Sequence, residues 1–283
     1  MLQIALPNKG ALADGAVDLA EDAGYHCRRS GRELSVRDPD HDVEFVFLRP
    51  RDIATYVSNG IIDLGVTGLD LTYDSGADVT RVLDLGFGAA RFCYAAPKDS
   101  TLTPDDFTDE TRIATSYDTL VRRDLERRGV DARVITLDGA VEISIQLGVA
   151  DVIADVVQTG RTIDEAGLKT IGNPILHSEA VLVAQNGATA ETEAAQHFAE
   201  RMRGIIVARE YVVVEYDLPE DHLPEAREIT PGIESPTVSP LSKEGWVAVK
   251  AMAERDAVNE IMDDLTELDA RGIIVTDIRT CRI

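Results

Sequence analysis

The first part of the chain alternates short apolar runs with segments of helical periodicity. Apolar runs at 3–6, 44–48, 63–67, 81–86 and 92–96 are typical of strands, and helical patterns occupy 11–23, 50–58 and 68–73. This alternation predicts an α/β unit that the strands at 81–86 and 92–96 close.

A second unit with the same rhythm begins near residue 97. Strands are expected at 112–115, 133–137 and from 152 onward, with helices at 119–128 and 141–148. After residue 167 two extended runs, 171–176 and 179–184, and a helix at 191–204 lead back toward the first unit. We therefore expect two lobes joined by crossing strands, with a cleft between them.

The last stretch has a different order of elements. A β-branched strand at 205–215, a polar helix at 218–227, strands at 232–238 and 246–251, a helix at 255–268 and a strand at 272–277 give the order βαββαβ. This order is the ferredoxin-like split unit, and the expected helix places Val258, Ile261, Met262 and Leu265 on one face. Residues 207–283 are predicted to form a small separate domain.

Charge and cysteine content restrict the classes of function. The 51 acidic residues outnumber the 28 basic ones for a net charge of −23, which argues against nucleic acid as a partner. Three widely spaced cysteines, Cys27, Cys93 and Cys281, indicate free thiols and not a zinc site or a disulfide framework. No apolar run approaches the length of a membrane span, and we expect a cytoplasmic protein.

The turn after residue 155 carries the strongest chemical signal. An apolar strand ends in Asp155, and Gln158, Thr159, Gly160, Arg161 and Thr162 follow at the start of an expected helix. Unpaired N–H groups at a helix start and nearby hydroxyls suit a phosphate, and a carboxylate before the turn suits ribose hydroxyls. An ordinary strand, a capping threonine and a helix without ligand form the alternative.

Three more polar turns follow expected strands in the first lobe. Lys9 stands in a strand-to-helix loop, and Arg49 and Arg51 flank a proline at a helix start. A Thr-Gly turn precedes Asp70, which could meet a polar ligand together with backbone amides. A solvated loop lysine and an ordinary capped helix are the alternatives here.

The second lobe offers a comparable set of side chains. Thr115 and Tyr117 end a strand one turn before Arg122 and Arg123, and Glu142 follows another polar turn. A basic surface pair and a glutamate favoured by the helix dipole are the ligand-free alternatives.

Taken together, these motifs resemble one enzyme family. Leu-Pro-Asn-Lys-Gly-Ala at 6–11, Phe-Leu-Arg-Pro-Arg-Asp-Ile at 47–53, Asp-Leu-Gly-Val-Thr-Gly-Leu-Asp at 63–70, Asp-Gly-Ala-Val-Glu at 138–142 and Ala-Asp-Val-Val-Gln-Thr-Gly-Arg-Thr at 154–162 are similar to the ATP phosphoribosyltransferases. Ser-Pro-Thr-Val-Ser-Pro-Leu at 235–241 and the terminal Ile-Arg-x-Cys-Arg-Ile resemble the regulatory domain of the long form of that family.

The resemblance implies a fold, a reaction and roles for the residues. The fold would be a two-lobed catalytic unit like the periplasmic binding proteins, with residues 1–94 and 179–206 in lobe I and 95–178 in lobe II. The family joins N1 of the ATP adenine to C1 of phosphoribosyl pyrophosphate (PRPP) with Mg²⁺ present, in the first step of histidine biosynthesis. Lys9, Arg49 and Asp155 would be catalytic, and Asp155 with the turn Gln158, Thr159, Gly160, Arg161 and Thr162 would bind PRPP. Arg51, Asp70, Thr115, Tyr117 and Glu142 would line the nucleotide side.

For the last domain the resemblance implies feedback inhibition by histidine, held by Asp217, Glu234, Ser235 and Thr237, in a homo-oligomer that is a dimer or a hexamer. Turn chemistry around Pro236 is the alternative for these residues.

Two rival functions belong to other classes. A prephenate dehydratase also joins a two-lobed unit to a small sensing domain, but its Thr-Arg-Phe signature is not found. A non-enzymatic two-lobed ligand sensor would need neither Asp155 nor the turn after it.

Overall fold

The computed structural model describes residues 1–31, 33–185 and 191–282. Ile283, the last residue of the terminal motif, lies outside the described residues. The chain divides into two compact units, Met1–Ala199 and Glu200–Ile283. Among the described residues, no helix is long and apolar enough to cross a bilayer.

The first unit holds a six-stranded sheet in which three neighbouring strands run parallel. Its order is β2 (Ser35–Arg37), β3 (Val43–Leu48), β1 (Leu2–Pro7), β4 (Leu64–Gly68), β11 (Ala180–Gln185) and β5 (Val79–Asp84). Helices α1 (Ala11–Asp22), α2 (Pro50–Ser58) and α3 (Leu69–Ser75) follow β1, β3 and β4. Ile53 and Val57 of α2 pack on this sheet, where Ala5, Val181 and Val183 complete a buried cluster.

A five-stranded sheet forms the other half of the first unit. Its order is β10 (Leu168–Ser178), β6 (Ala90–Pro97), β9 (Val152–Val157), β7 (Arg112–Thr115) and β8 (Arg133–Thr136). It is accompanied by η1 (Pro104–Asp106), α4 (Asp118–Arg128), α5 (Ile143–Gln146) and α6 (Arg161–Glu165). Leu120, Val121 and Leu125 of α4 join Tyr94 and Ile113 in the core of this sheet.

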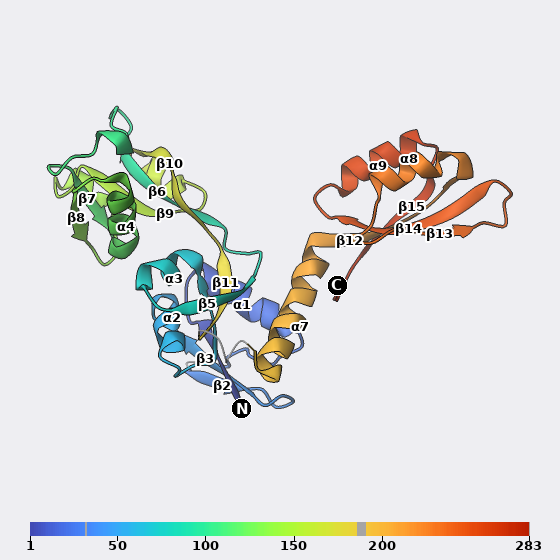
Figure 1. The fold of residues 1–283 in the computed structure, drawn as a ribbon, viewed down its shortest axis with the longest axis horizontal. Coiled ribbons are helices and arrows are strands. Elements are labelled where there is room, and N and C mark those ends of the chain that lie inside the picture. Colours follow the sequence, from blue (N-terminus) through green and yellow to red (C-terminus); the bar gives the residue numbers. More distant parts are fainter. Residues whose placement is uncertain (32, 186–190, 283) are drawn as a thin grey trace. The chain divides into compact units, whose positions relative to one another are not determined.

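The chain passes from the first sheet to the second between β5 and β6, and it returns between β10 and β11 (Figure 1). The segment 85–88 is therefore a crossing turn. The expectation that the strand at 92–96 closes the first sheet is wrong, because β6 pairs with β9 and β10 in the second. An apolar run predicts a strand but not the sheet to which the strand belongs. Phe92 and Tyr94 are completely buried in the core of the second sheet.

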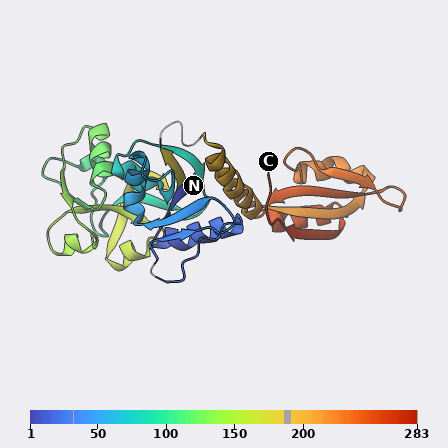
Figure 2. The same cartoon turned by 90° about the horizontal axis from the view of Figure 1, so that it is seen from below.

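The second unit has the predicted βαββαβ order. Its elements after α7 (Glu193–Glu210) are β12 (Tyr211–Pro219), η2 (Glu220–His222), α8 (Leu223–Ile229), β13 (Thr237–Pro240), β14 (Trp246–Glu254), α9 (Val258–Glu267) and β15 (Arg271–Asp277). The strands lie side by side in the order β13, β14, β12, β15, and every neighbouring pair is antiparallel (Figure 2). α8 and α9 cover one face of the sheet (Figure 1), which confirms the ferredoxin-like prediction.

The strand predicted at 205–215 is wrong in its first half. Residues 205–210 continue helix α7, and the strand begins at Tyr211. β-Branched side chains at Ile205, Ile206 and Val207 favour a strand by propensity, but all three are buried in the helix. Packing therefore overrides the local preference.

The cysteines are free thiols, as the sequence indicates. Cys27 and Cys93 are buried and Cys281 is half-buried. Burial raises the pKa of the Cys27 thiol to about 12, so this group stays protonated and unreactive at neutral pH.

Candidate functional site

The carboxyl ends of three parallel strands bring the predicted residues of the first sheet to one edge. β1 lies between β3 and β4. Lys9 follows β1, Arg49 follows β3, and Asp70 follows β4. Lys9 and Arg49 are exposed, whereas Asp70 is buried. The edge therefore carries two exposed cations and a buried carboxylate after neighbouring strands, where open α/β sheets bind ligands.

The second sheet presents the other predicted residues at its own carboxyl edge. β7 lies between β8 and β9 and runs parallel to both. Tyr117 follows β7, and the turn 158–160 follows β9. Glu142 comes after β8 and immediately precedes α5.

Two predicted residues of the first edge, Arg51 and Asp70, contact the predicted Tyr117 of the second. The Arg51 guanidinium lies 4.7 Å from the centre of the Tyr117 ring. Asp70 interacts with the Tyr117 hydroxyl, and burial and this carboxylate raise the pKa of Tyr117. Asp70 also accepts a 2.6 Å hydrogen bond from the Ser178 hydroxyl, at the end of β10. The carboxyl edges of both sheets therefore meet at Tyr117.

Asp155 lies in β9 near this meeting point. Burial raises the pKa of its carboxyl, and the nearby carboxylates of Glu142 and Asp70 raise it further. The hydrogen bond from the Val156 N–H, at 2.7 Å, and the Arg51 charge act in the opposite direction. Asp155 is thus a half-buried carboxylate in a negative environment.

The polar side chains of the turn after β9 are exposed. Gly160 occupies the N-cap of α6 with φ of 79°, a conformation that suits glycine, and the helix has no side-chain cap. Gln158, Thr159 and Thr162 are exposed, and Arg161 pairs with Glu165 at 2.6 Å. The Thr159 hydroxyl accepts a 3.4 Å hydrogen bond from the Arg161 N–H at the start of α6, which is the kind of contact that the ligand-free alternative of a capping threonine predicts.

Thr115 has a more internal position than the sequence suggests. Its side chain is completely buried, donates a 2.7 Å hydrogen bond to the Ala154 carbonyl and accepts one of 2.9 Å from the Tyr117 N–H. The hydroxyl therefore fixes the backbone that carries Tyr117 and does not face the surface.

Sequence analysis missed three residues at these edges. Asp74 lies one turn after Asp70 on α3 and contacts Arg51, a spacing that could have drawn attention to it. Ser178 carries no signal in the sequence, because it reaches Asp70 only through the fold. Asn8 lies in the loop that holds Lys9, and its buried Oδ1 has no hydrogen-bond partner among the residues that the structure describes.

In the second unit, two of the predicted regulatory residues share the face of the sheet opposite the helices. Asp217 of β12 alternates with the buried residues of that strand. Thr237 of β13 is in register with Lys250, which pairs with Glu215 at 3.0 Å on the same face. Glu234 and Ser235 are exposed in the loop before β13.

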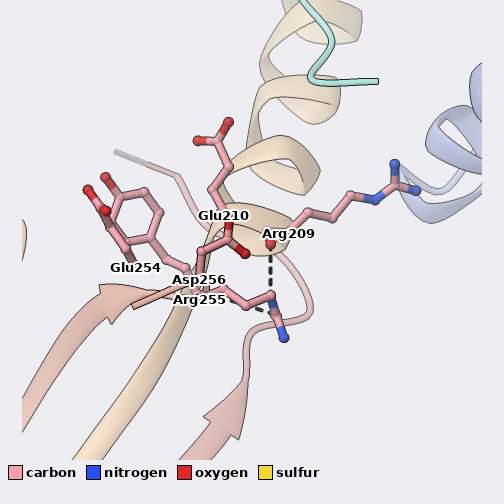
Figure 3. Close-up of a pocket in the computed structure, with 6 residues that line it drawn as sticks. Arg209, Glu210, Glu254, Arg255 and Asp256 are labelled. Atoms are coloured by element: carbon pink, nitrogen blue, oxygen red, sulfur yellow. Dashed lines mark hydrogen bonds between the residues drawn. The ribbon is translucent and has the colours of Figure 1, made fainter. Parts of the chain in front are cut away.

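Two cavities of the second unit lie elsewhere. One of about 290 Å³ is lined by Arg209, Glu210, Tyr211, Glu254, Arg255 and Asp256 (Figure 3). One of about 510 Å³ lies beside the loop before β13 and is lined in part by Ile229, Ile233 and Ile261. Among the residues described as lining them, none is a predicted regulatory residue.

One further group of side chains has donor atoms for a metal ion. His26, Asp38 and Asp40 place ligand atoms within 4.8 Å of one another. The buried Asp38 carboxylate already accepts hydrogen bonds from the His26, Asp40 and His41 N–H groups. This group lies at the start of β3, where the Asp38 N–H donates to the Val43 carbonyl at 3.0 Å, and not at the carboxyl end of the strand that Arg49 follows.

Two models of known protein families match most of the chain from residue 49 onward. The family model of HisG, ATP phosphoribosyltransferase, matches residues 49–204, and that of the HisG C-terminal domain matches residues 208–280. An ATP phosphoribosyltransferase of Salinibacter ruber is 87% identical over 283 residues and is covered completely, as is this chain. Relatives of the same name from Nocardia farcinica and Mycobacterium tuberculosis are 52% and 49% identical over the full length of this chain, with 99% and 100% of the relative covered.

Solved structures agree on the fold of about three-quarters of the chain. A chain of the ATP phosphoribosyl transferase (HisG:HisZ) complex from Thermotoga maritima aligns with a TM-score of 0.63 and 27% identity, over 73% of this chain and 98% of that one. A putative L-cystine ABC transporter protein from Listeria monocytogenes aligns with a TM-score of 0.50 and 11% identity, over 72% of this chain and 89% of that one, which supports the fold alone.

These matches decide between the enzyme and its two rivals. Neither a prephenate dehydratase nor a non-enzymatic sensor accounts for whole-chain identity to ATP phosphoribosyltransferases. The chain therefore belongs to the ATP phosphoribosyltransferase family, the glycosyltransferases that join ATP to PRPP in the first step of histidine biosynthesis.

Proposed function

We propose that ATP and PRPP react where the carboxyl edges of the two sheets of the first unit meet. One observation carries this placement: Arg51 and Asp70 of the first sheet contact Tyr117 of the second. Asp155 lies within electrostatic reach of Arg51, Asp70 and Tyr117, and Glu142 lies within reach of Asp155. Residues distant in the sequence thus form one polar group at the ligand edge of both sheets.

Asp155 and the turn after it bind PRPP. The Asp155 carboxylate accepts hydrogen bonds from the ribose hydroxyls, as acidic residues do at other nucleotide sites. Main-chain N–H groups of the turn and the hydroxyls of Thr159 and Thr162 hold the 5-phosphate, with Gln158 and Arg161 at its rim. The exposed positions of both threonines support this role, and the Thr159 hydroxyl, which accepts a long 3.4 Å hydrogen bond from the Arg161 N–H, lies at the helix start where the phosphate would bind.

The reaction forms a bond between adenine N1 and ribose C1. The C1–oxygen bond breaks at the same centre, and the electron pair leaves with pyrophosphate. Positive charge grows on the ribose and negative charge on the leaving group. Fixed charges of the protein and the alignment of the two substrates therefore contribute most to the rate. The exposed Lys9 and Arg49 at the first edge neutralise the pyrophosphate. No side chain has to remove a proton from N1 before it attacks.

The nucleotide lies against the group formed by Arg51, Asp70, Tyr117 and Glu142. Arg51 offers a cation to the ATP phosphates, and the other three offer a ring and polar atoms. Thr115 contributes through the backbone of Tyr117, since its hydroxyl is used internally.

The carboxylates at the meeting point fit Mg²⁺. Mg²⁺ is held by one or two carboxylates together with substrate phosphates and water. Burial raises the pKa of Asp155 most, and the negative charges of Glu142 and Asp70 raise it further. A cation would offset that negative charge, so Asp155 and Glu142 are the residues that would hold it. When bound there, Mg²⁺ supplies positive charge to the departing pyrophosphate.

Asp155→Ala and Thr162→Ala test the PRPP site. Each is expected to raise the KM for PRPP by about 10-fold or more, because each removes a hydrogen-bonding group worth roughly 1.4 kcal/mol to the bound phosphate or ribose. Asp164→Ala is the matched control, because Asp164 lies on the same short helix but pairs with Lys98 at 2.5 Å. An unchanged KM for PRPP in both variants would reject the assigned site.

Histidine inhibits the enzyme from the second unit. Asp217 meets the amino group of histidine, and Ser235, Thr237 and Glu234 meet its carboxylate or ring. The shared sheet face of Asp217 and Thr237 supports this placement. Asp217→Ala and Thr237→Ala should weaken inhibition by about 10-fold while the uninhibited rate stays unchanged. Glu220→Ala, at an exposed position of η2, is the control; inhibition that persists unchanged in both variants would remove the site from this face.

The enzyme works as a homo-oligomer, a dimer or a hexamer, in the cytoplasm. Light scattering on the purified protein, with and without histidine, measures the assembly directly, and a monomer under both conditions would contradict this part of the proposal. Deletion from residue 208 onward should abolish inhibition by histidine, since it removes all four candidate ligands.

A further inference from the structure

Asp74 is a buried carboxylate with partners on both sheets of the first unit. It lies on α3, after the first sheet, and its side chain is only 5% exposed. One carboxylate oxygen accepts a 2.6 Å hydrogen bond from Arg51 Nη1. The other accepts hydrogen bonds from the backbone N–H groups of Thr119 at 3.1 Å and Leu120 at 3.2 Å, in the first turn of α4.

Asp74 takes the place of an N-cap residue for α4. The first N–H groups of a helix have no partner within it and need an acceptor. Tyr117, at the N-cap position of α4, provides no side-chain hydrogen bond. The Asp74 carboxylate supplies it from another helix, and its charge suits the positive end of the helix dipole.

The contact between α3 and α4 is reciprocal. Arg123 of α4 donates a hydrogen bond from Nη1 to the Tyr73 carbonyl, at 3.2 Å, close to the carboxyl end of α3. Each helix therefore provides a hydrogen-bond partner for backbone groups near one end of the other. Because α3 follows the first sheet and α4 follows the second, this contact fixes one carboxyl edge against the other.

The same carboxylate orients the cation of the nucleotide side. Arg51 is 45% exposed, and a long exposed side chain explores many rotamers unless a partner holds it. Its hydrogen bond to Asp74 holds the guanidinium 4.7 Å from the centre of the Tyr117 ring. Tyr117 in turn precedes the helix that Asp74 caps.

We propose that Asp74 is a positioning residue for ATP, which holds Arg51 and Tyr117 together and aligns the two sheet edges that carry them. This inference rests on the placement of ATP under Proposed function. Asp74 does not touch the reacting atoms; it acts through Arg51 and through the first turn of α4. Its removal should therefore affect ATP more than PRPP.

The test is a set of steady-state kinetics on the full chain. Asp74→Ala should raise the KM for ATP by about 10-fold and lower kcat, while the KM for PRPP stays within about twofold. Asp74→Asn keeps an acceptor for α4 but removes the charge that holds Arg51, so it should raise the KM for ATP by about threefold. Should Asp74→Ala fail to fold, Asp74→Asn alone still decides the question.

Asp124→Asn is the matched control for a structural effect. Asp124 is a buried carboxylate on the same helix α4, where it pairs with Arg127 and Arg128 and accepts a 3.1 Å hydrogen bond from the Tyr94 hydroxyl. Asp124→Asn should lower the melting temperature without raising the KM for ATP relative to the KM for PRPP. If Asp74→Asn behaves in the same way, Asp74 is a structural residue only and the inference is overturned.

Arg51→Ala separates this inference from the site on which it rests. If Arg51→Ala raises the KM for ATP and Asp74→Asn does not, the nucleotide site stands and the role of Asp74 is rejected. If Arg51→Ala leaves the KM for ATP unchanged, the placement of ATP fails and the inference fails with it. A rise in both variants, with no further rise in the double variant, supports the coupled pair.

Discussion

Asp155 is partly buried in an environment that opposes its charge, and the proposed binding of ribose requires that charge. Burial and the neighbouring carboxylates of Glu142 and Asp70 raise its pKa. A group of this kind costs stability in the free enzyme and gains favourable partners when a ligand arrives. Local strain of this type is common at functional sites.

Asp155→Asn is therefore expected to separate stability from activity. The amide keeps the size of the side chain but removes the charge, so kcat should fall by about 100-fold while the melting temperature at neutral pH rises. Thermal unfolding and steady-state kinetics on one preparation measure both. A variant that is both less active and less stable at neutral pH would contradict the electrostatic explanation.

The same substitution predicts a pH dependence of stability. Because the folded pKa of Asp155 is raised, the folded protein holds this proton at pH values where the unfolded chain has released it. The contribution of Asp155 to the free energy of unfolding thus falls as pH rises above the ordinary aspartate value of 3.8, until the folded pKa is passed. The gain in the free energy of unfolding from Asp155→Asn should therefore vanish as pH falls below 3.8, where aspartate is protonated in both states. Denaturant titrations at several pH values measure this gain.

At the level of single residues, the sequence predicts which residues lie at the ends of strands better than it predicts the contacts between their side chains. Asp70, Tyr117 and Asp155 were predicted because each follows or ends an apolar run. Asp74 and Ser178 were missed because their partners lie between 23 and 108 residues away, and only the fold brings them together. Thr115 was predicted correctly as a strand end, but its burial depends on β9 beside it.

Helix α7 shows why the boundaries of elements are harder to predict. Its residues from Ile205 to Ala208 are all buried, so the hydrophobic pattern there has no polar face to reveal a helical period. Gly204 in the same helix is also buried, and the chain near Cys281 crosses it: the Cys281 N–H donates to the Gly204 carbonyl at 2.9 Å.

Gly204→Ala is predicted to destabilise the second unit, although alanine normally favours a helix. A Cβ atom there would lie 2.8 Å from the Cys281 carbonyl oxygen, which is too close for both to remain in place. We expect a loss of about 1–2 kcal/mol in the free energy of unfolding. In a chain that ends at residue 278 the clash is absent, and the substitution should instead stabilise by up to about 1 kcal/mol. The same sign in both backgrounds would show that the tail does not constrain this glycine.

Arg255 holds the carboxyl end of α7 within the second unit. Its guanidinium donates a 2.8 Å hydrogen bond to the Arg209 carbonyl (Figure 3). It also donates to the Ala208 carbonyl at 3.2 Å and pairs with Asp277 at 2.7 Å. These carbonyls are the ones that a helix leaves unpaired at its end.

Arg255→Lys keeps the charge but cannot span both carbonyls and the carboxylate, because an ammonium lacks the planar fork. It should lower the free energy of unfolding by about 1–2 kcal/mol in urea titrations. Asp277→Asn, which removes only the exposed ion pair, is the control and should cost less than about 1 kcal/mol. Equal losses would mean that the ion pair, and not the helix end, carries the stabilisation.

At the scale of the whole molecule, the order of elements was predictable and their assignment to sheets was not. Local periodicity and turn residues gave two α/β regions followed by βαββαβ, because each depends on neighbouring residues. The membership of β6 in the second sheet depends on pairing with β9 and β10, which no local pattern records.

The net charge of −23 acts on the molecule as a whole, and it predicts how stability responds to salt. Exposed ion pairs are worth about 0–1 kcal/mol each, and salt weakens them. The excess of negative charge repels itself over longer distances, and salt screens this repulsion more strongly as the Debye length falls from about 10 Å at 0.1 M to about 3 Å at 1 M. Since acidic residues outnumber basic ones by 51 to 28, the relief of repulsion should exceed the loss of ion pairs.

The melting temperature is therefore expected to rise between about 0.1 M and 1 M NaCl, with most of the rise at the lower concentrations, where screening changes fastest. Sucrose stabilises by exclusion from the protein surface and does not screen charge, so it provides the control. The salt effect should shrink as pH falls toward the isoelectric value of about 4.5, because the net charge itself disappears there. A salt effect of equal size at neutral pH and near that value would assign the stabilisation to general exclusion from the surface and not to charge.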